Sequence, residues 1–392
     1  MIKNCTLYFP TENVQLSLAL PNIKEDGNIF TYYIEDNPVR LNILPADEVD
    51  QHVSGFKGFV ARQANPGVNR VKAINMLSEA KTVIGVDLIE EITPESQTFT
   101  SLMHILNTFD GFMFVANSIL LAGGDFLVGP MAESAEESEL QFPPEPEIVP
   151  INPEDFRQGG DTSSVDPQVL SKRESHYRLL GERGFKCALW LPLYRTEGPI
   201  ELRPAEEIGG RLFALCALFY WVSAPEEYAP SARLKNFVQA NNLREHLTEE
   251  ELKILDTDRS QAKEEYAMNI GWRLENMWVL AWILGYEREP KFYEGQIHDE
   301  IISGMMDFIP NFDGVLTDFL KDCKVRPAQE VSDLEDIFYC THNAVRSAQY
   351  GALTVPVNYH SVYVGGCVHE RRHSLTWAVS PGIDWDETDL ST

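Results

Sequence analysis

The sequence predicts an α+β N-terminal domain followed by a mostly α-helical C-terminal domain that is built around one central buried helix. Three observations predict this fold class. Up to residue 130, short β-branched and aromatic runs alternate with helical patterns. Residues 131–168 are acidic and rich in proline, and residues 169–392 have helical patterns with few strand signals. A chain of 392 residues is also long for a single domain.

The first 130 residues contain short apolar runs closed by proline or by turn-forming residues, and amphipathic segments lie between them. The expected strands are residues 6–9, 29–34, 39–44 and 82–90, and the expected helices are residues 50–63, 69–79 and 98–108. Residues 112–129 are expected to form two strands joined by a turn at Gly123, Gly124 and Asp125. Strands and helices in this order indicate an α+β domain of residues 1–130.

Residues 131–168 differ from both flanking regions, because they combine many carboxylates with several prolines and a pair of glycines. Repulsion between like charges and the stiffness of proline disfavour a packed element in such a stretch. We therefore expect an acidic, proline-rich linker between the two domains.

The C-terminal domain is organised by residues 272–285, WRLENMWVLAWILG. Residues 277–284 contain no polar side chain, so this helix has no polar face and must lie inside the domain with other helices around it. The segment is too short to span a bilayer, which takes about 20 apolar residues. Arg273 and Glu275 carry charge into its first turns, and buried charges need partners.

Several further helices are expected around this central one. They cover residues 167–184, 204–221, 235–247, 299–308, 315–322 and 329–350. Thr248, followed three residues later by Glu251, is typical of a capping box that opens one more helix. These elements make residues 169–392 a mostly helical domain.

The charge balance limits the range of partners. Sixty acidic residues against 32 basic ones give a net charge of −28. Nucleic-acid binding depends mainly on Lys and Arg, so this charge disfavours DNA or RNA as a partner. A basic protein partner fits this charge. A protein that is merely soluble, without such a partner, fits it equally well.

Other features of the sequence point to the cytoplasm. The six cysteines are scattered without a CxxC pair, which is typical of a reducing compartment. The N-terminus lacks the apolar stretch of a signal peptide, and no apolar run is long enough to cross a membrane. We expect a cytoplasmic protein that contacts no membrane. Its oligomeric state stays open.

Five stretches of the C-terminal half carry a resemblance to a known family. They are KRESHYRLLGERGF, LRPAEEIGGRLFAL, WRLENMWVLAWILG, VRPAQEVSDLEDIFYCTHNAV and ERRHSLTWAVSPGIDWDETDLST. In this order, over residues 172–392, the chain resembles the bacterial domain-of-unknown-function family 4272. The resemblance implies a mostly helical cytoplasmic domain and no established activity. Cys340 and Asn343 depart from the pattern, because Arg and Trp are more usual there.

His369, Glu370 and His373 form an H-E-x-x-H sequence, the sharpest motif in the chain. On a helix the two histidines share a face and could bind zinc or another divalent metal, while Glu370 acts as general base on a bound water. The third ligand would follow at Asp386 or at a neighbouring carboxylate. Arg371 and Arg372 weigh against a metal site, because their charge would crowd a dication.

A wider set of polar residues recurs at helical spacing or follows the motif, and could line one polar cleft. Besides the motif and Asp386, the set comprises Glu207, Arg211, Arg273, Glu275, Glu330, Asp333, Asp336, Tyr339, His342, Arg346, Arg371 and Asp384. Within it, Glu370, His342 and Asp336 are the candidate catalytic residues for acid-base or metal-assisted hydrolysis. The alternative is a buried network of ion pairs that fixes helix register. We favour this alternative, because structural ion-pair networks perturb pKa values much as active sites do.

Two functions therefore remain. The first is a cofactor-free, acidic protein-interaction module that binds, neutralises or tethers a basic partner, since the chain combines strong negative charge with no strong catalytic motif. The second is a metal-dependent hydrolase that uses His369, Glu370, His373 and Asp386.

Overall fold

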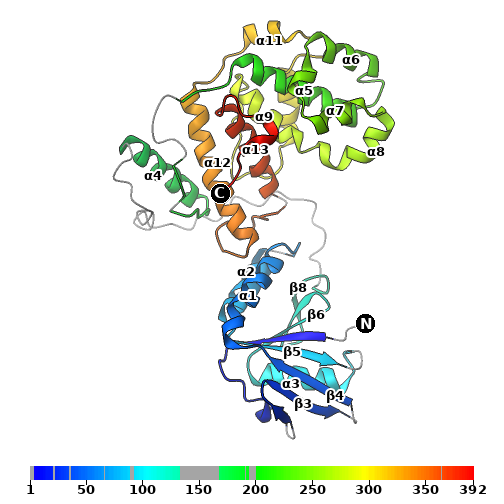
Figure 1. The fold of residues 1–392 in the computed structure, drawn as a ribbon, viewed down its shortest axis with the longest axis vertical. Helices are drawn as coiled ribbons and strands as arrows, with labels where there is room; N and C mark the ends of the chain where they lie inside the picture. The colour runs from blue at the N-terminus through cyan, green and yellow to red at the C-terminus, as the bar shows by residue number, and fades with distance from the viewer. Residues whose placement is uncertain are drawn as a thin grey trace. The chain divides into compact units, whose positions relative to one another are not determined.

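The computed structural model describes residues 4–20, 23–34, 37–65, 67–88, 92–132, 167–189, 191–193, 200–362 and 364–392. The chain forms two compact units (Figure 1). The first comprises Met1–Pro146 and Arg346–Ser361, and the second comprises Glu147–Val345 and Val362–Thr392. Apart from its two ends, the linker expected at residues 131–168 lies outside the described residues. The predicted fold class is confirmed: the first unit is α+β and the second is helical.

In the described part of the first unit, eight antiparallel strands form one sheet in the order β2-β3-β4-β5-β1-β6-β7-β8. The strands are β1 Asn4–Phe9, β2 Lys24–Asp26, β3 Ile29–Ile34, β4 Asn37–Ile43, β5 Thr82–Leu88, β6 Phe112–Val115, β7 Ser118–Leu121 and β8 Phe126–Val128. The first strand lies in the middle and pairs with β5 on one side and with β6 on the other.

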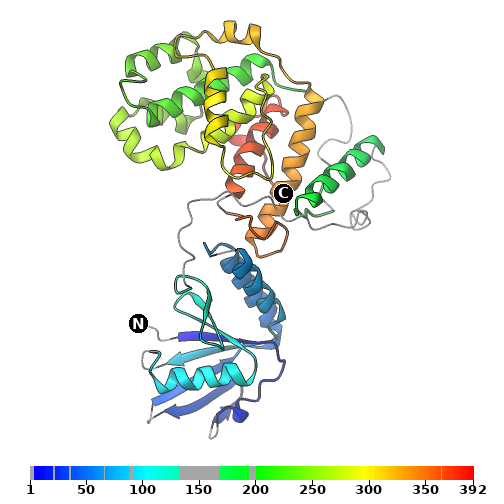
Figure 2. The same ribbon diagram turned by 180° about the vertical axis from the view of Figure 1, so that it is seen from behind.

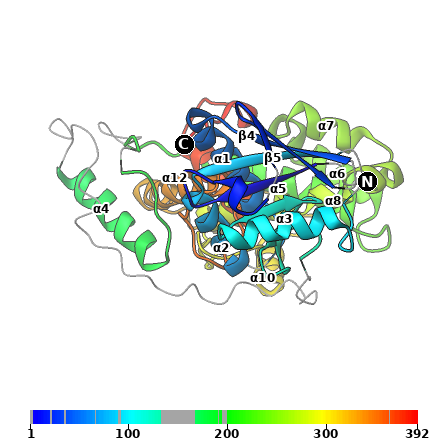
Figure 3. The ribbon, with the colours of Figure 1, turned by 90° about the horizontal axis from the view of Figure 1, so that it is seen from below.

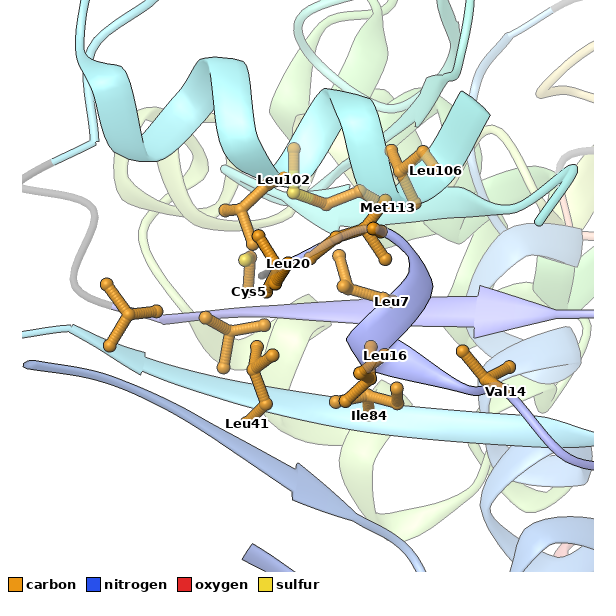
Figure 4. Packing of buried hydrophobic residues seen from close by; sticks show 14 of the residues in the cluster. Cys5, Leu7, Val14, Leu16, Leu20, Leu41, Ile84, Leu102, Leu106 and Met113 are labelled. Carbon is orange, nitrogen blue, oxygen red and sulfur yellow. The ribbon is translucent and has the colours of Figure 1, made fainter. Parts of the chain in front are cut away.

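Helices cover both faces of this sheet. The helices are α1 Ala46–Ala61, α2 Gly67–Glu79 and α3 Gln97–Thr108, with a short 3-10 helix, η1, at Leu16–Leu18. Side chains alternate along β1, so Leu7 packs toward α3 and η1 (Figure 4), whereas Tyr8 packs toward α1 and α2. Helix α3 lies along the first of these faces (Figures 2 and 3).

One turn of the sheet was not predicted. The sequence predicts two strands in residues 112–129, but the structure has three, because β6 and β7 are joined by a two-residue turn at Ala116 and Asn117. Both residues have positive φ, 49° and 57°, as a turn with the right-handed twist of a hairpin requires. The turn contains no glycine, which is the usual signal for it. The short strand β2 was missed as well.

The described part of the second unit contains ten α-helices. They are α4 Pro167–Glu182, α5 Ala205–Ser223, α6 Ser231–Ala240, α7 Glu249–Asp256, α8 Arg259–Ile270, α9 Arg273–Ile283, α10 Asp299–Phe308, α11 Leu316–Asp322, α12 Ala328–Gln349 and α13 Gly365–Ala378. Two short 3-10 helices, η3 Leu243–His246 and η4 Trp385–Glu387, accompany them. The last residues of α12 belong to the first unit. None of the helices in the described part of the chain could span a membrane.

Helix α9 is the predicted central helix. Each residue from Leu274 to Leu284 is buried, and the helix packs against α5, α10 and α13. Figures 1 and 2 show α9 and α13 side by side. The helix ends at Ile283 and is followed by Gly285, whose φ of 114° suits glycine; a Cβ there would come within 3.0 Å of the Lys324 backbone. A helix without a polar face is therefore fully enclosed.

The segment before α7 bears out one prediction and corrects another. The capping box is present, since the Glu251 N–H donates to Thr248 Oγ1 at 3.2 Å and the Thr248 N–H donates to Glu251 Oε2 at 3.1 Å. The helix expected at residues 235–247 is divided, because α6 ends at Ala240 and Asn242 adopts the left-handed region with φ 51°.

The β6–β7 turn offers a test of local strain. Alanine in the left-handed region costs roughly 1 kcal/mol, so Ala116→Asn combined with Asn117→Gly should slow amide exchange in the hairpin roughly fivefold. Hydrogen-exchange mass spectrometry of residues 112–121 measures this change. The matched control is Gly124→Ala in the β7–β8 turn, where φ is 93° and a side chain is strained, so exchange should become faster. Unchanged exchange in the first variant would contradict the assigned turn.

Candidate functional site

The two charges carried into α9 have different partners. Glu275 accepts a hydrogen bond from Arg371 Nε at 2.8 Å through one carboxylate oxygen and from the Ile297 N–H at 2.8 Å through the other. The side chains of Glu275 and Arg371 are 2% and 0% exposed. Arg371 lies over the ring of Trp278, 4.7 Å from its centroid, and also donates to three carbonyls of the chain after α9. Every polar group of this pair is therefore used inside the fold.

Arg273 belongs to a second cluster, centred on the fully buried Glu251. Arg211 binds this carboxylate in a bidentate manner at 2.6 and 2.9 Å, and Arg273 approaches it to 3.2 Å. Burial raises the pKa of Glu251, but the two guanidinium groups outweigh burial and hold the pKa below its usual value. The ring of Trp385 covers Arg211 at 4.0 Å. Arg273 is 30% exposed, so this cluster reaches the surface.

His342 and Arg372 form a third cluster, between α12 and α13. Arg372 Nη1 donates to His342 Nδ1 at 2.7 Å and to the Leu390 carbonyl at 2.8 Å. The same guanidinium lies 4.0 Å from Glu335 and covers the ring of Tyr339. His342 therefore uses Nδ1 to accept from a buried cation. The hydrogen bond from Arg372 to the Leu390 carbonyl fixes the C-terminal tail to α13.

Asp336 joins α4 to α12. It accepts from Arg173 at 2.5 Å and lies 2.6 Å from His176 Nδ1. Burial raises the pKa of Asp336, yet the contacts with His176 and Arg173 together lower it below its usual value. Asp333, one turn earlier on α12, pairs with Lys172 at 2.5 Å. Both aspartates thus hold α4 in place.

The remaining acidic residues of the expected cleft make separate contacts. Glu207 accepts from Arg203 at 2.8 Å, and not from Arg211, whose guanidinium points to Glu251. Glu330 accepts from Arg326 at 2.8 Å, and Glu370 accepts from the Asn276 side chain at 3.1 Å. The Asp384 backbone carbonyl accepts from the Thr388 hydroxyl. The structure thus places the residues expected in one polar cleft in several separate contacts.

The histidines of the H-E-x-x-H sequence lie on α13 with their ring centroids 6.4 Å apart. His373 Nε2 donates to the Trp385 carbonyl at 2.9 Å, and the centroids of the His373 and Trp385 rings are 4.2 Å apart. The His369 ring lies 5.3 Å from that of His342. Burial lowers the pKa of His373 to about 4, while its bond to Trp385 opposes the shift. In the described ranges, no group of three His, Cys, Asp or Glu side chains is arranged to hold a metal ion.

Asp386, the expected third ligand, is exposed beside the Glu251 cluster. Burial raises the pKa of its carboxyl, and Glu251 and Glu250 raise it further. Arg211 and Arg273 oppose this shift. Carboxylates therefore crowd together where η4 meets the start of α7.

Sequence reasoning missed the arginines that recur through this unit and the glutamates that pair with them. The missed residues are Arg173, Arg203, Arg259, Arg326, Glu251 as an ion-pair partner, and Glu335. Arg203 stands four residues before Glu207, a spacing that could have identified this pair. The partners of Arg211 and Arg371 lie 40 and 96 residues away, so no local pattern indicates them.

Comparison with known proteins gives one family. The family model described as Domain of unknown function (DUF4272) matches residues 172–388. No curated protein and no solved structure matches the chain. The matched segment contains the side chains that form each of the clusters described above.

The Glu275–Arg371 pair should be essential for stability. Glu275→Ala leaves a buried guanidinium without its carboxylate and should lower the free energy of unfolding by about 3–5 kcal/mol. Guanidinium titration followed by tryptophan fluorescence reports on the second unit, because all seven tryptophans lie at residue 190 or later. The matched control is Asp318→Ala, which breaks the exposed pair with Lys321 and should leave the free energy of unfolding nearly unchanged, because solvent screens exposed charges. Equal losses in the two variants would contradict a structural role for Glu275.

His373 should make the second unit sensitive to mild acid. Below pH 6.5 the unfolded chain binds a proton at this residue, whereas the folded chain does not until about pH 4. The free energy of unfolding should therefore fall between these two pH values, by at most about 3 kcal/mol from this group. His373→Gln should remove that part of the decrease in fluorescence-monitored titrations. His104→Asn, on exposed α3 surface, serves as control, and an unchanged slope in His373→Gln would contradict the assignment.

Proposed function

The chain belongs to the family described as Domain of unknown function (DUF4272), and from its charge distribution we propose that it is an acidic protein-interaction module. Its partner is a basic protein, which it binds without a cofactor. The proposal is supported by the roles of the buried polar residues: Glu275, Arg371 and Arg372 are all used in contacts within the fold. The carboxylates on the surface are then the main chemical feature offered to a partner.

One acidic surface carries the proposal. Glu249 and Glu250 are exposed in the first turn of α7, and Asp386 is exposed on η4. The raised pKa of Asp386 reflects burial together with the nearby carboxylates of Glu251 and Glu250. A carboxylate whose pKa is raised by neighbouring negative charges attracts a cationic group, since a bound cation relieves the repulsion. Asp384, Glu387 and Asp389 extend the negative surface along the tail.

A metal-dependent hydrolase is the second candidate, favoured by the proximity of the His342, His369 and His373 rings. The bonds of His342 to Arg372 and of His373 to Trp385 occupy nitrogens that a metal would need. A chelator separates the two candidates. The interaction module binds its partner unchanged in the chelator, whereas a hydrolase loses its metal and its activity.

Binding of a basic probe should depend on this acidic surface. A fluorescein-labelled decalysine peptide should bind the full chain, and raising the salt from 0.05 to 0.5 M should weaken binding roughly tenfold or more because salt screens the charges. Replacing Glu249 and Glu250 by Gln and Asp386 by Asn should weaken binding roughly fivefold at low salt. Fluorescence anisotropy measures both effects.

The control variant removes the same charge from another acidic surface. Asp47→Asn, Glu48→Gln and Asp50→Asn neutralise three exposed carboxylates on α1 in the first unit. This triple variant should bind decalysine nearly as tightly as the unmodified chain. Equal weakening by the two triple variants would mean that only net charge matters, and would contradict the assigned surface.

A further inference from the structure

Two cysteines that are far apart in the sequence meet in the second unit. Cys187, which follows α4, and Cys340, on α12, are neighbours: the Ala188 N–H, next to Cys187, donates to Asn343, one turn from Cys340, and the Cys187 thiol contributes to the raised pKa of Cys340. Both are free thiols, and they differ in exposure: Cys340 is fully buried, whereas Cys187 is partly exposed. Of the remaining cysteines, Cys367 contacts Glu275 instead. The pair therefore combines one accessible thiol with one protected thiol.

The backbone around Cys187 is held against α12. The Ala188 N–H donates to Asn343 Oδ1 at 2.8 Å, and Asn343 stands one turn after Cys340 on the same helix. On the other side, Arg173 donates to the Leu191 carbonyl at 3.1 Å and to Asp336. These bonds tie the segment that carries Cys187 to the helix that carries Cys340. The approach of the two thiols is thus fixed by directional contacts on both sides.

The surroundings give the two thiols different chemistry. Burial raises the pKa of Cys340 well above its usual value, and its contacts with Cys187 and Asp336 add to the shift. Arg173 lies close enough to oppose it. Because the thiolate is the reactive form and an oxidant must reach the sulfur, Cys187 is the thiol that reacts first. Cys340 remains a thiol next to the oxidised Cys187.

We propose that Cys187 is an oxidation site for peroxides and that Cys340 is its resolving thiol. The Cys187 sulfur attacks one peroxide oxygen, the O–O bond breaks, and a sulfenic acid forms while the other oxygen leaves as water. The Cys340 sulfur then attacks the sulfenic sulfur, the S–O bond breaks, a second water leaves and a disulfide forms. Two thiols are oxidised by two electrons, and hydrogen peroxide is reduced to two molecules of water.

The disulfide would change how α4 is attached. In the reduced chain α4 is held to α12 by polar contacts, chiefly those of Asp336 with Arg173 and His176. A covalent bond between residues 187 and 340 closes a long loop and restricts the unfolded chain. Oxidation therefore locks α4 onto α12 independently of the pH or salt that affects the ion pairs. This inference does not depend on the proposed function.

The experiment treats the reduced full chain with hydrogen peroxide under native conditions. The number of free thiols should fall from six to four, and proteolysis without reduction should release a peptide pair joined through Cys187 and Cys340. The melting temperature of the second unit should rise by roughly 5–10 °C and return after reduction. A disulfide between other cysteines, or only between two chains, would overturn the proposal.

Two variants separate the roles of the two cysteines. Cys340→Ser should accumulate a sulfenic acid at Cys187 that dimedone traps, while Cys187→Ser should leave Cys340 reduced and form no disulfide. Cys216→Ser is the matched control, since it removes a buried cysteine on α5 and should form the disulfide at the normal rate. Circular dichroism establishes that each variant is folded. If Cys340→Ser is folded but Cys187 stays a thiol under peroxide, the proposal fails.

Discussion

The second unit depends on one recurring interaction, a guanidinium group held between an aromatic ring and backbone carbonyls. In its described residues seven arginines make it: Arg173, Arg203, Arg211, Arg259, Arg326, Arg371 and Arg372. The last turns of helices and the connections between helices leave carbonyls that no helix or sheet satisfies, and burying them without partners is costly. Arginine suits this role because its planar group carries five donors and stays charged, while the ring covers its face.

The central helix takes part in this arrangement through its tryptophans. Trp278 supports Arg371, and Trp282 supports Arg326, whose Nε also donates to the Trp282 carbonyl at 2.9 Å. The apolar helix and the buried cations are therefore parts of one construction. The rings that make α9 apolar also provide the surfaces on which the arginines rest. Removing one partner leaves either an uncovered cation or an unpaired carbonyl, so the helices around α9 have little freedom to change register.

Prediction from the sequence succeeded where the signal is local. The apolar run of α9 can only be enclosed, and the Thr248 capping box depends on two residues three positions apart. Prediction failed where conformation lacks its usual marker, as at Ala116, which adopts positive φ without glycine. The division of the helix at Asn242 did have a marker, because Asn adopts the left-handed region more readily than most residues.

The polar residues of the second unit illustrate a different limit. Glu207 has an arginine four residues away on each side, Arg203 and Arg211, so helical spacing allows either pair. Arg211 binds the carboxylate of Glu251, which is distant in the sequence. Glu207 therefore pairs with Arg203. Spacing identifies which residues could interact, whereas the packing of distant helices decides which do. A list of polar residues can therefore be right in its members and still not specify its pairs.

The arginines that bind backbone carbonyls also affect where the charged groups of this unit lie. Among the described residues of the second unit, five arginines are buried, but only three glutamates are buried with them. The buried arginines are Arg173, Arg203, Arg211, Arg371 and Arg372, and the glutamates are Glu251, Glu275 and Glu335. Backbone carbonyls, which carry no net charge, accept many of the donors of these arginines. The two arginines without a buried glutamate, Arg173 and Arg203, pair with the partly exposed carboxylates of Asp336 and Glu207. The arginines that satisfy the carbonyls of this unit therefore also neutralise two carboxylates at the edge of its interior.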